Sequence, residues 1–134
     1  MSTIIRAAAV GFAVAAGVFL NGPVRAETQQ QWDWCQGEGG VPQDIQISAC
    51  TVLIYSGTLA GKDLAWAYYN RGVSYGEGRD YARAIHDFDE SIRLDPTDAD
   101  VFWLRHVAKE NLGDMVGAEA DSKVAKRLNP KKYQ

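Results

Sequence analysis

Several residues of this 134-residue chain recur at one fixed interval, the interval from Asp80 to Asp114. This recurrence is the feature that most constrains the fold. The recurring positions are those of a helix that begins after an aspartate and ends before a proline. They are Asp80 and Asp114, Ala84 and Ala118, Leu94 and Leu128, and Pro96 and Pro130. Because a period of this length accommodates two helices and their turns, the sequence predicts helical hairpins that stack and share a core.

The local sequence predicts five helices, over residues 44–57, 64–77, 81–94, 99–112 and 115–128. An aspartate stands at the start of each, where its carboxylate can accept hydrogen bonds from free backbone N–H groups. The expected N-caps are Asp44, Asp63, Asp80, Asp98 and Asp114. Gly57 is expected to close the first helix, and Pro96 to end the third, since a residue before proline avoids the helical conformation.

The segment 81–94 has the pattern of an amphipathic helix. Its apolar residues have the spacing of a single buried stripe, and they are Ala84, Ile85, Phe88 and Ile92. The charged residues are expected on the opposite, solvated face, and they are Asp87, Asp89, Glu90 and Arg93. Asp89 and Arg93 lie four residues apart, in the order that favours an ion pair on a helix.

The residue types at many positions of the two recurring segments resemble the pattern of the tetratricopeptide repeat. Over 65–98 the residues that fit the family pattern are Tyr68, Gly72, Tyr75, Ala84, Phe88, Ser91 and Pro96. Over 99–132 they are Phe102, Gly113, Ala118, Ala125 and Pro130. The second repeat departs from the pattern at His106, Lys109 and Ser122. The resemblance implies two repeats, 65–98 and 99–132, preceded by a half repeat at 44–62.

The N-terminal segment, 1–26, has the composition of a secretory signal peptide. Arg6 precedes fourteen apolar or small residues, and the sequence Val24-Arg25-Ala26 favours cleavage after Ala26. The apolar run is shorter than the roughly 20 residues that a membrane-spanning helix needs. The sequence therefore predicts a periplasmic or secreted protein without a membrane contact after cleavage, and the alternative is an uncleaved N-terminal anchor.

The charge of the remaining chain, 27–134, limits its partners. Without Arg6 and Arg25, the 14 basic residues become 12 against 17 acidic ones, and the formal net charge changes from −3 to −5. An acidic surface repels the phosphates of nucleic acids and anionic lipids. We therefore expect no nucleic acid as a partner.

The two cysteines, Cys35 and Cys50, are predicted to form a structural disulfide. Export would place them in an oxidising compartment, where disulfides form and persist. Their spacing is not that of a C-x-x-C redox motif, and a zinc site would need more ligands. Free thiols or intermolecular pairing are the alternatives. The bond would attach an irregular N-terminal cap, 27–43, to the helical domain, 44–134, and stabilise the small domain by restricting the unfolded chain.

Catalytic motifs are absent from the sequence, as are phosphate-binding loops and metal-binding motifs. His86 is expected on the surface, and His106 as a partly buried, hydrogen-bonded side chain. Asp87 and Asp89 are two residues apart, so they do not face each other on a helix. The sequence therefore predicts a non-enzymatic protein without cofactor or metal.

The resemblance implies where a partner would bind. In tetratricopeptide repeat proteins the first helix of each repeat lines a concave surface that holds the partner. Carried over by position, this surface consists of Trp66, Tyr69, Asn70, Val73, Glu77, Asp100, Trp103, Leu104, Val107 and Asn111. Large aromatic residues are typical binding anchors. The alternative is that Trp66 and Trp103 pack against the N-terminal cap or against each other.

The sequence predicts an all-α fold, an antiparallel tetratricopeptide solenoid of about two and a half repeats with a disulfide-stapled N-terminal cap. It resembles small exported tetratricopeptide proteins of the Gram-negative envelope. The first hypothesis is an adaptor or scaffold that binds a protein or peptide. One alternative is a homo-oligomer that stacks through Val124, Ala125 and Leu128 of its last helix. The other is a thiol-redox or metal-binding protein.

Overall fold

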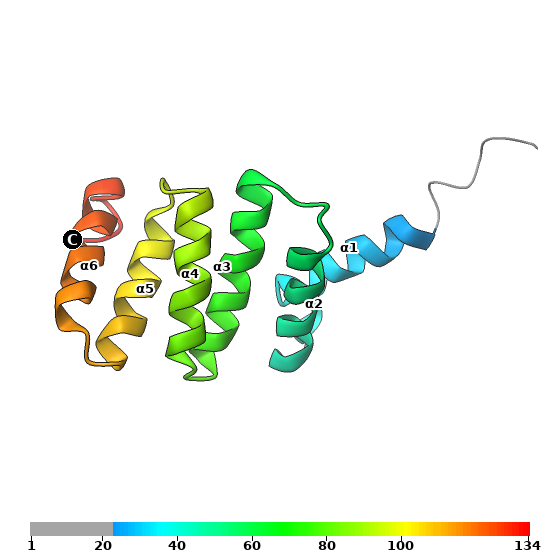
Figure 1. Cartoon of the computed structure of the whole chain (residues 1–134), viewed down its shortest axis with the longest axis horizontal. Helices are drawn as coiled ribbons and strands as arrows, with labels where there is room; N and C mark the ends of the chain where they lie inside the picture. Colours follow the sequence, from blue (N-terminus) through cyan, green and yellow to red (C-terminus); the bar gives the residue numbers. More distant parts are fainter. Residues whose placement is uncertain (1–22) are drawn as a thin grey trace, which may run out of the picture.

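The chain is a row of antiparallel helices in the computed structural model, which describes residues 23–134. Its six α-helices are α1 (Pro23–Cys35), α2 (Gln43–Tyr55), α3 (Gly61–Glu77), α4 (Tyr81–Leu94), α5 (Ala99–Asn111) and α6 (Met115–Leu128), and a short 3-10 helix (Glu38–Gly40) lies between α1 and α2. Helices α2 to α6 lie side by side, whereas α1 projects from one end of the row (Figure 1). No strand occurs within 23–134, which confirms the all-α solenoid.

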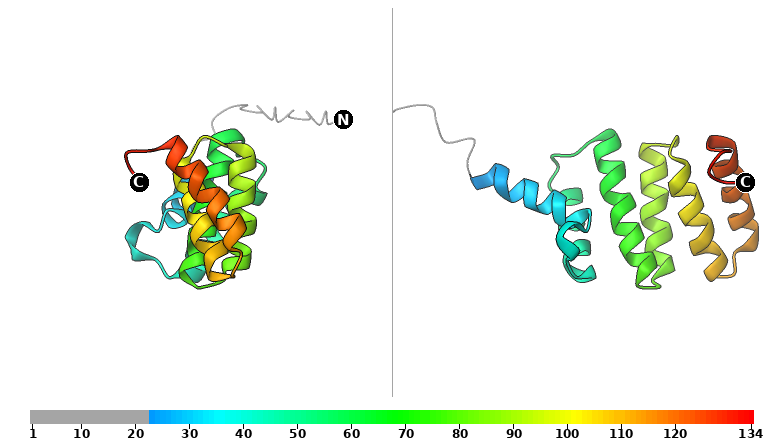
Figure 2. Two further views of the ribbon diagram at one scale, coloured as in Figure 1. Left: turned by 90° about the vertical axis from the view of Figure 1, so that its left-hand side faces the viewer. Right: turned by 180° about the vertical axis from the view of Figure 1, so that it is seen from behind.

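The two described ends of the chain lie at opposite ends of the row, as the view from behind shows (Figure 2). None of the helices within 23–134 has the length and apolar character that a bilayer-spanning segment requires. The predicted signal peptide lies outside the described residues, except for its last four, which begin α1.

The close approach of α3 and α4 depends on a glycine. A Cβ atom at Gly72 would lie only 2.7 Å from Cε1 of Phe88, so a larger residue would force Phe88 or the helices to shift. Phe88 is buried in a core cluster with Ala84, Val101 and Ala108, which joins α4 to α5. This packing fixes the positions of α3 and α5, which carry the predicted binding residues.

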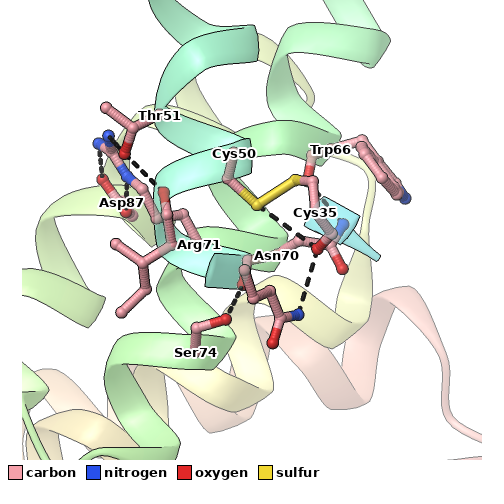
Figure 3. Close-up of a disulfide and its surroundings, with 10 residues drawn as sticks. Cys35, Cys50, Thr51, Trp66, Asn70, Arg71, Ser74 and Asp87 are labelled. Atoms are coloured by element: carbon pink, nitrogen blue, oxygen red, sulfur yellow. Dashed lines mark hydrogen bonds and ion pairs between the residues drawn. A yellow bond between two sulfur atoms is a disulfide. The ribbon is translucent and has the colours of Figure 1, made fainter. Parts of the chain in front are cut away.

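A second core cluster lies around the disulfide at the start of the row. Cys35 of α1 and Cys50 of α2 are bonded and fully buried, which confirms the predicted pairing (Figure 3). They pack with Ala49, Leu53, Ile54 and Ala67. The disulfide therefore attaches α1 to the solenoid within a hydrophobic core.

The expectation of an irregular cap over 27–43 is wrong for its first part, because α1 is helical as far as Cys35. The glutamines of this segment favour a helix, and no glycine precedes Gly37 within it. The helix cannot continue beyond this point, because Gly37, Gly39 and Gly40 have positive φ. Trp32 and Trp34 of α1 pack against the disulfide cluster, so this helix contributes to the core.

The predicted aspartate caps are correct at three of the five helix starts. Asp80, Asp98 and Asp114 each accept a hydrogen bond from a backbone N–H in the first turn of α4, α5 and α6. Asp44 and Asp63 are not caps, because α2 and α3 begin earlier and enclose them in their first turns. There they still favour the helix through its dipole.

Candidate functional site

The predicted binding residues belong to α3 and α5, and seven of the ten line two hollows between these helices. We call the surface formed by these ten residues the A-helix face, because α3 and α5 are the first helices, or A helices, of the two predicted repeats. The first hollow, the acidic hollow, has a volume of about 370 Å³. Its lining residues are Lys62, Ala65, Trp66, Tyr69, Ser91, Asp95, Asp98 and Asp100. It therefore contains three of the predicted residues, beside carboxylates from the α4–α5 connection.

The second hollow, the apolar hollow, has a volume of about 290 Å³. Its lining residues are Val73, Gly76, Glu77, Tyr81, Phe88, Leu104, Val107 and Ala108. Four of them are predicted binding residues, from the C-terminal parts of α3 and α5. An apolar side chain of a partner could enter here, since burying it would remove apolar surface from water.

In the acidic hollow, carboxylates surround the phenol of Tyr69. Burial raises the pKa of Tyr69, and the nearby carboxylates of Asp100 and Asp98 raise it further. Hydrogen bonds from Thr97 lower the pKa of Asp95, which therefore stays ionised at neutral pH. A neutral phenol beside ionised carboxylates can receive a cation and donate a hydrogen bond, which is the chemistry of a basic side-chain subsite.

The two tryptophans of the predicted set are covered by other parts of the chain. Trp66 packs on Trp32 of α1, with ring centroids 4.5 Å apart, so it meets the N-terminal segment as the alternative interpretation supposed. Trp103 packs instead on Tyr133 of the C-terminal tail, with centroids 4.7 Å apart, and on His106. The two tryptophans are thus covered by segments from opposite ends of the described residues.

The two asparagines of the set use their amides within their own helices. Asn70 donates through Nδ2 to the carbonyl of Trp66 at 2.9 Å, and Asn111 donates to that of Val107 at 2.8 Å. Together with Trp103 they are the predicted residues that line neither hollow.

A buried ion pair, absent from the sequence-based expectations, joins α3 to α4. Arg71 donates through Nε and Nη2 to the two oxygens of Asp87, both at 2.8 Å (Figure 3). Its Nη1 reaches Thr51 of α2 at 3.1 Å. The prediction of a solvated Asp87 is wrong, because only 1% of this residue is exposed. One arginine therefore ties three consecutive helices together.

The same arrangement recurs between α5 and α6. Arg105 donates to both oxygens of Asp121, at 2.8 and 2.6 Å, and through Nη1 to Asp89 of α4 at 2.7 Å. Lys109 adds a contact of 2.8 Å to Asp121. Burial raises the pKa of Asp121, but hydrogen bonds from Arg105 and Lys109 outweigh it and hold the pKa below its ordinary value. The predicted pair of Asp89 with Arg93 does not form.

Arg93 bonds instead to Glu90, at 2.8 Å. The sequence did hold a signal for the two buried pairs, because Arg105 and Asp121 follow Arg71 and Asp87 at the interval of the repeat. The bonds hold neighbouring helices in register, and both arginines are largely enclosed. We therefore assign these pairs to the scaffold that positions the A-helix face.

The histidines and cysteines, the remaining side chains that could carry out chemistry, do not form a reactive site within the described residues. Nδ1 of His106 lies 3.1 Å from the carbonyl oxygen of Ala118, whereas His86 is exposed. Within the described part of the chain, no group of His, Cys, Asp and Glu is arranged to hold a metal ion. Both cysteines are consumed by the disulfide, so neither offers a free thiol.

The family model of the tetratricopeptide repeat matches residues 65–98, a segment that coincides with the first predicted repeat. No curated protein matches the chain. The family match and the helical fold together support a protein–protein interaction module, a kind of domain that is generally non-enzymatic.

Proposed function

We propose that this chain is a non-enzymatic adaptor or scaffold of the cell envelope, which binds a protein or peptide segment on its A-helix face. The observation that carries the proposal is the pair of hollows between α3 and α5, one acidic with an aromatic wall and one apolar. Predicted binding residues line both. A segment along this face would meet a charged subsite and an apolar subsite in succession, which is how extended peptides gain specificity.

The location in the envelope rests on two features of the N-terminal region. The first is the predicted signal peptide, 1–26, and the second is the buried disulfide between Cys35 and Cys50. Disulfides of this structural kind persist in exported proteins. A small exported module of the Gram-negative envelope, acting in the periplasm or outside the cell, accounts for both.

The test is chemical crosslinking in living cells, followed by capture of the chain and identification of the proteins bound to it. The variant that tests the face is Tyr69→Ala with Val107→Ala, one residue from each hollow. The two tryptophans stay in place, because they support other segments of the chain. The control is Val52→Ala with Val116→Ala, two exposed residues of α2 and α6.

We expect the wild type and the control to retain a partner that the Tyr69/Val107 variant loses. All three proteins must have the same helical content and thermal midpoint. Identical captures from the two double variants would contradict binding on the A-helix face.

Self-association is the second candidate function, and exposed apolar residues at the α5–α6 turn favour it. Leu112, Met115 and Val116 are all exposed, Val116 to 85%. Of the residues that the sequence analysis placed at the stacking surface of α6, Leu128 is exposed, whereas Val124 is half-buried and Ala125 is buried. Sedimentation at rising concentration tests this candidate, since stacking predicts an increasing mass that Val116→Glu abolishes.

A further inference from the structure

The C-terminal tail, residues 129–134, turns back from α6 and is seated on α5. Lys132 donates through Nζ to Oδ2 of Asp100 at 2.7 Å, and Tyr133 donates through its hydroxyl to Oδ1 at 2.7 Å. The ring of Tyr133 stacks on Trp103, with an interplanar angle of 20°. Two consecutive tail residues thus occupy both oxygens of one carboxylate and one face of an indole.

The two side chains that receive the tail both belong to the predicted binding set. Asp100 also lines the acidic hollow, so the tail ends at the edge of that hollow. The docked pair has a definite chemistry, a cation next to an aromatic ring with a hydroxyl group. The tail therefore gives one example of the side-chain chemistry that this part of the A-helix face can hold.

The acidic hollow continues this preference beyond the tail. Asp95 and Asp98 lie with Asp100 around it, and the lining cation, Lys62, is largely exposed and 3.5 Å from Asp95. Three carboxylates against Lys62 and the tail's Lys132 leave the hollow with a negative charge. A partner with further lysines or arginines would be attracted more strongly than the tail.

The tail is held by contacts that a competitor can replace. Lys132 and Asp100 both remain partly open to water, with side-chain exposures of 53% and 38%. Ion pairs with this much exposure contribute little, because water and salt screen them. The tail nevertheless has the advantage of being attached to the same molecule, which gives it a high effective concentration.

We propose that the A-helix face recognises a basic–aromatic peptide segment, and that Lys132 and Tyr133 occupy part of this site as an internal competitor. The partner's aromatic ring replaces Tyr133 on Trp103. Its first cation replaces Lys132 on Asp100, and its further cations enter the acidic hollow. The proposal rests on the proposed function, because it specifies the partner of the same face.

The probe is a synthetic peptide with the sequence of residues 129–134 and an N-terminal fluorophore. Its binding is measured by fluorescence anisotropy with the full chain, disulfide intact. The tail variant is Lys132→Ala with Tyr133→Ala, which empties the site without shortening the chain. The matched control is Lys131→Ala with Gln134→Ala, since both of these tail residues are exposed.

We expect the tail variant to bind the peptide at least about ten-fold more tightly than the wild type and the control, because the internal competitor is removed. Adding Asp100→Asn to the tail variant should reverse the gain, and raised salt should weaken binding. A folded tail variant that does not bind the peptide would overturn the proposal. Binding that is unchanged by Asp100→Asn would overturn it as well.

Two further results separate this inference from related ones. A wild-type dimer that the tail variant lacks would assign the tail's site to a second copy, and would overturn the internal competitor. If the crosslinking experiment finds a partner that depends on Tyr69 and Val107, but the peptide does not bind, the proposed function stands and this inference fails. Peptide binding without a cellular partner would support the subsite and count against the adaptor.

Discussion

Removal of the Asp87 carboxylate gives a sharp test of the scaffold. The side chains of Arg71 and Asp87 are only 9% and 1% exposed, and two hydrogen bonds of 2.8 Å join them. In an Asp87→Ala variant, the guanidinium of Arg71 stays enclosed without a carboxylate partner and keeps one side-chain hydrogen bond, to Thr51. Breaking a buried ion pair in this way costs about 3–5 kcal/mol, because one charge remains without its partner.

The expected loss of unfolding free energy is large compared with the total stability of a small domain, which is about 5–15 kcal/mol. Urea unfolding, followed by circular dichroism of the helices, measures it. With a denaturant dependence of about 2 kcal/mol per M, the midpoint should fall by about 2 M. Asp89→Ala is the matched control, two residues away on α4.

Asp89 is 52% exposed and contacts Arg105, which retains Asp121 as a partner. Its removal should therefore cost less than about 1 kcal/mol. Equal midpoints for Asp87→Ala and Asp89→Ala would refute the claim that the buried pair locks α3 to α4. Replacing both partners, by Arg71→Met with Asp87→Leu, should restore much of the lost stability, since no charge is then left unpaired.

Three other predictions follow from the packing, the disulfide and the tail. Gly72→Ala should destabilise the fold by about 1–3 kcal/mol through its clash with Phe88. Gly76→Ala, whose Cβ would meet nothing nearer than 3.9 Å, should be neutral or stabilising by up to about 1 kcal/mol, and the reverse order of stabilities in urea unfolding would contradict the observed packing. Replacing both disulfide cysteines by alanine should cost about 3 kcal/mol, because the bond closes a loop with a sequence separation of 15, and an unchanged unfolding midpoint would argue against this. The hydrogen bond from Lys132 holds the pKa of Asp100 below its ordinary value, so the tail contact should be complete above about pH 4 and should be lost as the pH falls through the lowered pKa. NMR of the Tyr133 ring measures this loss, and release of the tail on raising the pH from 5 to 7 would contradict the prediction.

The helices of the two full repeats were predictable, because their signals are local. The repeat interval and the aspartates before α4, α5 and α6 locate those helices closely, and only the end of α5 differs from the prediction. Helix α1 was missed, because an irregular cap was expected over the whole of 27–43, a segment that includes the glycines from Gly37 to Gly40. Those glycines affect only the residues after Cys35.

Long-range contacts decided what local patterns could not. Asp87 has the sequence context of a solvated helix face, and only the position of Arg71 on the neighbouring helix explains its burial. The same holds for the two tryptophans of the candidate site. Trp66 is covered by Trp32, from α1, and Trp103 is covered by the tail. Helical periodicity places such residues on a face but does not show which segment covers them.

The most direct test of binding on the A-helix face is site-specific photocrosslinking in living cells. A photoreactive amino acid at position 107 would report from the apolar hollow, where Val107 is 37% exposed. The same residue at position 116 would report from α6, outside both hollows. We predict an adduct with another protein from position 107 and none with that protein from position 116. Adducts from position 116 alone, or only with a second copy of the chain, would contradict the account.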